Sequence, residues 1–171
     1  MRSANRGSTY VAILLIGMGV LFLAMNMFVS GYYVARGWPA IFYILAAGFY
    51  LPPLLWRDQI RRLSGLFIPA SVMLALGLIF TYDVLTLDWA SWGYAWTLIV
   101  AGIGGGMALA GWSGRWGSVP TWVGNWMLLG SLAIFALFSS IFGLSPLKLA
   151  GPALLIIAGI FLIGRGFRTK R

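Results

Sequence analysis

Six apolar stretches, separated by short polar breaks, decide what this chain can fold into. They are 16 to 22 residues long. An α-helix rises ~1.5 Å per residue, so about 20 residues cover the ~30 Å hydrocarbon core of a bilayer. A helix also pairs its own backbone groups, which lipid requires. The sequence therefore predicts an all-α integral membrane protein with six transmembrane helices, over 9–29, 38–55, 65–82, 92 or 93–110, 121–142 and 149–164.

Composition supports this class and excludes several chemistries. Of the 171 residues, 61% are hydrophobic and 9% are charged, and the mean hydropathy is +0.92. A soluble domain carries roughly 25% charged residues. The chain has no cysteine and no histidine, which excludes disulfides, thiol catalysis, Cys/His zinc sites and bis-His haem. We therefore expect no catalytic residue, no cofactor and no metal site.

The same order of sequence features recurs three times along the chain. An apolar run with a glycine is followed by a Trp-Pro-type pair, a second apolar run with a small residue, and a basic residue. Pro39 and Thr97 are 58 residues apart, and Thr97 and Pro152 are 55 apart. A fixed period of this kind is typical of an array of one supersecondary unit. We predict one transmembrane domain over 1–171, built as three repeated helical hairpins at about 9–62, 65–118 and 121–171. The repeat signature is Gly19, Asn26, Trp38 and Pro39, then Gly77, Trp96 and Gly104, then Pro152 and Gly159.

Basic residues predict the orientation, because short loops rich in Lys and Arg stay in the cytoplasm. With six spans, one side holds ten of the twelve basic residues: Arg2, Arg6, Arg57, Arg61, Arg62, Arg115, Arg165, Arg168, Lys170 and Arg171. The other side holds Arg36 and Lys148. We expect both termini in the cytoplasm. The first stretch follows a basic start as a secretory signal does, but its 21 residues favour a retained helix.

Few polar residues fall inside the predicted spans. Asp83 ends the third span, and we expect it to be a solvated helix end, followed by a loop to Ser91. The alternative is a carboxylate through which a cation or proton enters the protein. Asn26 and Asn125 stand at span ends, where they either lie among headgroups or bond across helices. The nine tryptophans divide between the two expected membrane interfaces, as aromatic anchors do.

Small residues mark one face of the fourth span. Gly102, Gly106 and Ala110 follow each other at four-residue spacing, which places them on one side of a helix. Such a face lets another helix approach closely in lipid. We predict that it packs against a neighbouring helix backbone, within the chain or in a second copy, with packing inside the chain favoured. Leu109 is expected to face lipid.

A family resemblance follows from the first repeat unit. Ile16-Gly-Met-Gly-Val-Leu-Phe-Leu-Ala-Met-Asn26, followed by Trp38-Pro-Ala-Ile-Phe-Tyr-Ile-Leu45, resembles the helix-pair repeat of the LiaI–LiaF-like transmembrane region. The second unit has Tyr82-Asp83 and Thr97 in place of the Asn and the Pro, and the third lacks the Trp. The resemblance implies a bacterial protein of the cytoplasmic membrane, in a family largely without assigned activity.

Two functions fit these observations. The first is a non-enzymatic membrane protein with a structural or regulatory role, acting through helix contacts with itself or with a larger membrane complex. The alternative is a small transporter or channel for a hydrophobic or small solute, since repeats and proline-interrupted spans are common in transporters. An enzyme ranks third. The expected partners are the lipid bilayer and a second copy or a larger complex. Nucleic acid is not expected, because the basic residues flank apolar runs.

Overall fold

The computed structural model describes residues 3–28, 36–114 and 116–142, together with 149, 152–153, 156–157 and 159–160. Every element assigned in these residues is helical. The longer helices are α1 (Ser3–Phe28), α3 (Ala40–Leu55), α5 (Phe67–Thr86), α7 (Thr97–Gly114) and α8 (Ser118–Phe142). Short turns of helix join them: η1 (Arg57–Gln59), α4 (Ile60–Leu63), η2 (Ser64–Leu66), η3 (Trp89–Ser91) and α6 (Trp92–Ala95). Most of the sixth predicted span lies outside the described residues.

Three helices of the described chain are long and apolar enough to cross a membrane. They run over Arg57–Thr86, Thr97–Gly114 and Ser118–Phe142. Two further apolar helices, at Ser8–Ala24 and Ala40–Leu55, are shorter. The prediction of an all-helical membrane protein is thus confirmed at this level, whereas the six-span hairpin repeat stays a prediction.

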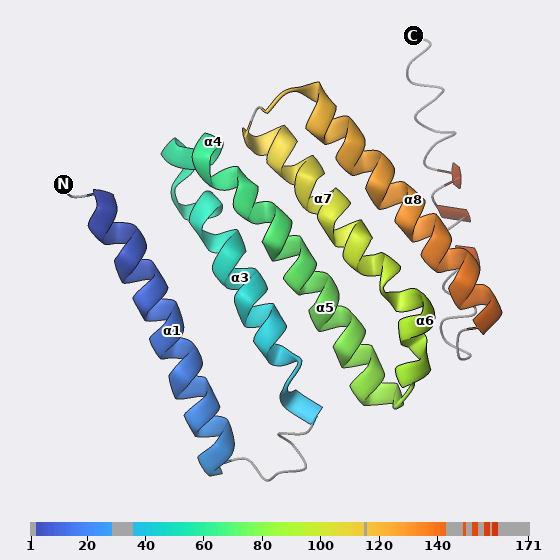
Figure 1. Cartoon of the computed structure of the whole chain (residues 1–171), viewed down its shortest axis with the longest axis horizontal. Coiled ribbons are helices and arrows are strands. Elements are labelled where there is room, and N and C mark those ends of the chain that lie inside the picture. The colour runs from blue at the N-terminus through green and yellow to red at the C-terminus, as the bar shows by residue number, and fades with distance from the viewer. Residues whose placement is uncertain are drawn as a thin grey trace.

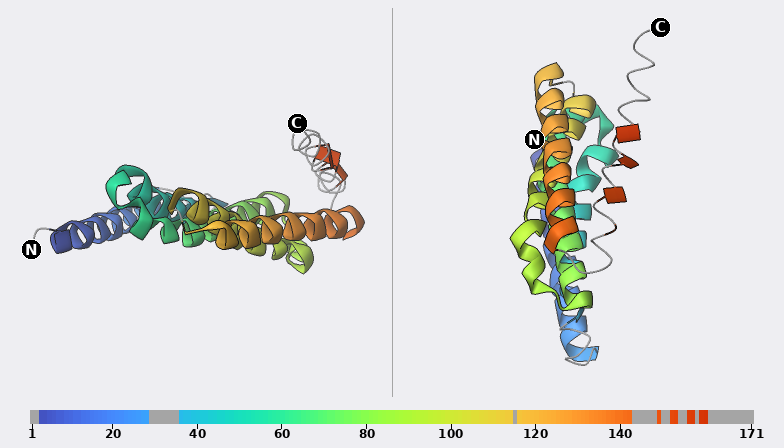
Figure 2. Two further views of the ribbon diagram at one scale, coloured as in Figure 1. Left: turned by 90° about the horizontal axis from the view of Figure 1, so that it is seen from above. Right: turned by 90° about the vertical axis from the view of Figure 1, so that its right-hand side faces the viewer.

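The five long helices lie side by side in chain order and form a layer one helix thick (Figure 1). Seen from above or edge-on, the layer is thin and slightly curved (Figure 2). Contacts are extensive between α3 and α5, between α5 and α7, and between α7 and α8, and they are few between α1 and α3. The N-terminus of α1, the α4 turn and the α7–α8 connection share one end of the layer (Figure 1).

Several element boundaries differ from the sequence prediction. The expected loop from Asp83 to Ser91 is wrong, because α5 runs to Thr86 and helical turns resume at Trp89. The expected loop from Gly111 to Pro120 is also wrong, since α7 continues to Gly114 and α8 begins at Ser118. The fourth span is not one helix, because Trp96 separates α6 from α7. In the first two cases helix extends into glycine or polar residues that the sequence alone marks as breaks, so tertiary packing overrides local propensity.

Candidate functional site

The predicted glycine face of α7 packs against the backbone of α5. A Cβ atom added to Gly106 would lie 2.5 Å from Ile68 Cα and 2.7 Å from Phe67 O. At Gly102 it would lie 2.8 Å from Ser71 O. No real Cβ tolerates such distances, so only glycine allows this approach. Ala110 is fully buried on the same helix. The structure therefore places all three predicted packing residues at contacts within the chain.

A second glycine contact, on the other side of α7, joins it to α8. A Cβ at Gly104 would lie 2.7 Å from Gly124 O, and a Cβ at Gly124 would lie 2.6 Å from Gly104 O. The backbones of the two helices therefore touch at this crossing. Sequence reasoning treated Gly104 only as a repeat position and gave Gly124 no role. The signal was present, because Gly104, Ala108 and Gly111 also follow at helical spacing.

The remaining signature residues occupy varied environments. Trp38 packs on Phe80 with ring centroids 4.7 Å apart, and Gly77 lies against the ring of Tyr43. Trp96 is half exposed. At Gly19 and Gly159 no described residue would meet an added Cβ. Pro39 is buried and Pro152 is helical and exposed, while the side chain of Asn26 lies outside the described set.

The two Trp positions share one local feature. Ile41 N–H donates to Trp38 O at 3.2 Å, and Ile99 N–H donates to Trp96 O at 3.0 Å. Each bond closes a turn at the start of the helix that follows, α3 or α7. The tryptophan therefore marks the same structural position in the first and second units, whatever the relation of the rest.

Asp83 is the residue whose environment differs most from the prediction made from the sequence. It is 0% exposed, so the expectation of a solvated helix end is wrong. The backbone turns back after Leu87, a non-glycine residue in the left-handed region at φ 57°, and this brings η3 and α6 alongside the end of α5. Ser91, also fully buried, donates its hydroxyl to Asp83 Oδ1. A buried carboxylate in a span is costly and is more often functional than an ordinary structural residue.

Within the described part of the chain, three buried oxygens at this end of α5 find no hydrogen-bond partner: Tyr82 OH, Asp83 Oδ2 and Tyr94 OH. Next to them is a cavity of about 110 Å³, lined by Tyr82, Ser91 and Tyr94 and by apolar side chains that include Leu78, Leu98 and Phe135. A cavity needs only about 15 Å³ to hold one water-sized group. The arrangement can hold a small group that hydrogen-bonds or coordinates oxygen atoms.

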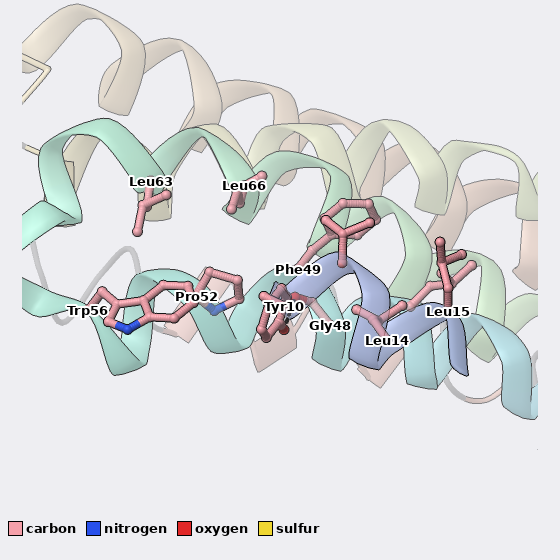
Figure 3. Close-up of a pocket in the computed structure, with 11 residues that line it drawn as sticks. Tyr10, Leu14, Leu15, Gly48, Phe49, Pro52, Trp56, Leu63 and Leu66 are labelled. Atoms are coloured by element: carbon pink, nitrogen blue, oxygen red, sulfur yellow. Dashed lines mark hydrogen bonds between the residues drawn. The ribbon is translucent and has the colours of Figure 1, made fainter. Parts of the chain in front are cut away.

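A larger feature is an apolar groove at the α1 edge of the layer, which Figure 3 shows. Its volume is about 320 Å³, and residues of α1, α3 and the α4–η2 turns line it: Tyr10, Val11, Leu14, Leu15, Leu45, Gly48, Phe49, Pro52, Trp56, Leu63 and Leu66. The Tyr10 hydroxyl donates to Gly48 O at 2.6 Å, and its ring meets Trp56 edge-on with centroids 5.6 Å apart. The phenol is thus satisfied, and the groove presents hydrocarbon.

Comparison with protein-family models, with curated proteins and with solved structures finds no match in any of the three. The described helices define the class of the protein: an all-helical chain with three helices that are long and apolar enough to cross a membrane. The resemblance to the LiaI–LiaF-like region rests on the quoted sequence motifs alone.

Proposed function

We propose that this chain is a non-enzymatic multi-pass membrane protein with a structural or regulatory role, acting through helix contacts with itself or with a larger membrane complex. The bacterial cytoplasmic membrane is the proposed location, with six spans and both termini in the cytoplasm. The positions of charge support this orientation, since Arg57, Arg61 and Arg62 lie at the same end of the layer as the N-terminus of α1 (Figure 1).

The observation that carries the proposal is the single-layer arrangement. Each inner helix packs against the long helix before it and the long helix after it, and no other described helix covers the two broad faces of the layer. Only 22% of the most apolar 18-residue stretch of α8 is buried against the described chain. A layer of this kind offers long, flat surfaces to which further helices can pack.

Exposed glycines support the same conclusion. Gly17 and Gly19 in α1 and Gly130 in α8 have nothing within 4 Å of an added Cβ. An interior helix glycine costs roughly 1 kcal/mol relative to alanine. At Gly102 and Gly106 a neighbouring backbone explains that cost, whereas at these three positions no part of the described chain does. Close approach of a helix from another molecule would explain it.

Cysteine cross-linking in native membranes tests the proposal, because the chain has no cysteine of its own. A single cysteine at Gly19 or Gly130 should give a disulfide-linked dimer or a cross-link to another membrane protein. The matched control is Ser139→Cys, since Ser139 is fully buried. If Gly19→Cys and Gly130→Cys give no cross-linked species, and the protein migrates in a native gel at the mass of one chain, the proposal fails.

A second candidate, a small transporter or channel for a hydrophobic or small solute, is favoured by one observation. The buried Asp83 and the cavity beside it place polar oxygens within a span. A carboxylate with hydroxyl neighbours can accept a small cation. Uptake of a monovalent cation into liposomes containing the protein, lost in Asp83→Asn, would support this candidate. If uptake of monovalent cations and of a hydrophobic dye is no faster than into empty liposomes, the transporter or channel is ruled out and the structural or regulatory role remains.

A further inference from the structure

The geometry points to the α1–α3 groove as a binding site for an anionic phospholipid, with an acyl chain in the groove and the phosphate at its basic rim. This inference needs only the membrane class of the protein, not its self-association or its orientation. The occupant follows from two separate features, which are the hydrocarbon lining and the charge at one end.

The lining accepts a chain rather than a polar molecule. The side chains that form it are aliphatic or aromatic, and Figure 3 shows Leu63 and Leu66 across from Trp56 and Pro52. Its one phenolic hydroxyl, on Tyr10, is already bonded to Gly48 O. Val11 and Leu15 on its α1 wall are 56% and 61% exposed, so the groove is open along its side to lipid. A flexible acyl chain can enter such a site from the bilayer without crossing water.

The charge lies at the end of the groove that Trp56 and Leu63 mark. Residues 57–62 hold three arginines and one aspartate, a net charge of +2, and all four side chains are exposed. Arg62 directly precedes Leu63, which lines the groove. Basic pockets between membrane helices bind the phosphates of anionic lipids, and an arginine fork matches a phosphate oxygen pair.

The groove stays open because α1 contacts α3 at few points. At Gly48 the two helices come close, since an added Cβ would meet the end of the Leu14 side chain. Tyr10 and Trp56 also meet, and the groove is the space that these contacts and the α4–η2 turns border. A lipid chain there would fill the gap and hold α1 against the rest of the layer.

The test measures lipid binding by the full-length protein in detergent, with phosphatidylglycerol, phosphatidylcholine and inorganic phosphate as the three probes. We expect phosphatidylglycerol to bind more tightly than phosphatidylcholine and to raise the melting temperature, and phosphate alone to do neither. Each arginine near an anionic headgroup contributes about fivefold, so Arg61→Gln with Arg62→Gln should weaken phosphatidylglycerol binding roughly 30-fold. Arg36→Gln is the control and should leave binding unchanged, because Arg36 precedes α3 and Arg61 and Arg62 follow the opposite end of that helix.

A second variant tests the apolar half of the site. Leu63→Trp should fill the groove and weaken binding of both lipids, whereas Leu129→Trp, on exposed α8, should not. Each variant is first checked for wild-type melting in lipid-free detergent. Equal affinity of the wild type for the two lipids, or an unchanged affinity in Leu63→Trp, would overturn the inference. A response to inorganic phosphate as large as that to phosphatidylglycerol would also overturn it, because the chain would then play no part.

Discussion

The two halves of the layer are built differently. Around α7, backbone meets backbone: Gly106 and Gly102 face α5, and Gly104 faces Gly124 of α8. At the α1 edge, contact is made by side chains, with Leu14 over Gly48 and Tyr10 against Trp56. In lipid, helices associate through packing and not through release of water, so contact area and distance set the strength of each pair. The α5–α7–α8 half should therefore be rigid, and α1 should detach first.

The largest effect should come from forcing a large side chain into the α5–α7 contact. Gly106→Leu would drive a side chain into the backbone at Phe67 and Ile68, so we expect a loss of about 3 kcal/mol or more in the free energy of unfolding. Thermal melting and size-exclusion migration in detergent measure this. Leu109→Ala is the control, since Leu109 is 39% exposed and should cost less. Unchanged melting and migration in Gly106→Leu would mean that the contact does not exist.

At the α7–α8 crossing, two substitutions should interfere with each other. Gly104→Ala and Gly124→Ala should each cost about 1–3 kcal/mol, because each added methyl group meets the opposite backbone. Once one methyl group has moved the helices apart, the second costs less. The double variant should therefore lose about 1 kcal/mol less than the sum of the two single losses. Strict additivity in melting experiments would show that these glycines do not face each other.

The polar end of α5 should give a moderate effect. Ser91→Ala removes the hydroxyl that donates to Asp83 Oδ1 and leaves a buried carboxylate without that bond. We expect a loss of about 2 kcal/mol in stability, measured by thermal melting. Ser113→Ala is the matched control, because the Ser113 hydroxyl donates to Leu109 O at an exposed position. Equal melting temperatures for the two variants would argue against a buried Asp83.

The smallest effect should be a gain in stability. Gly19→Ala adds a methyl group where nothing lies within 4 Å and removes the entropic cost of an interior glycine. We expect about 0.5–1 kcal/mol of added stability for the isolated chain in detergent. In membranes the same variant should weaken cross-linking through this face if a second helix packs there. A destabilised monomer would show that α1 has a close neighbour in the chain at this position.

Apolar runs predicted the long helices, because the length of a run and its hydropathy determine whether it is a long helix. The α7 face was also predictable, since glycine inside a helix is unfavourable and close packing against another helix offsets that cost. The helix ends were not. Asp83 follows an apolar run and precedes a second acid, a pattern that is typical of a solvated loop, yet α5 continues because α6 folds back beside it. That burial depends on tertiary contact between Ser91 and Asp83, for which the sequence has no periodic signal.

The groove was equally hidden from the sequence. Its lining comes from three separate segments, and none of them differs in composition from an ordinary lipid-facing stretch. Only the basic residues at 57–62 are unusual in the sequence of this region, and by themselves they predict an orientation in the membrane. Their proposed role in lipid binding depends on the groove beside them, which results from the packing of α1 on α3 and the α4–η2 turns.

The most direct measurement compares one substitution in the two halves. Gly106→Ala and Gly48→Ala each add one methyl group, but the first meets the α5 backbone and the second meets the flexible end of Leu14. For a chain of this size, 1 kcal/mol shifts the melting temperature by about 2–4 °C. In one lipid nanodisc preparation, Gly106→Ala should lower the melting temperature by about 4–8 °C and Gly48→Ala by about 2 °C or less. Equal shifts, or a larger shift for Gly48→Ala, would contradict the division into a rigid half and a loose edge.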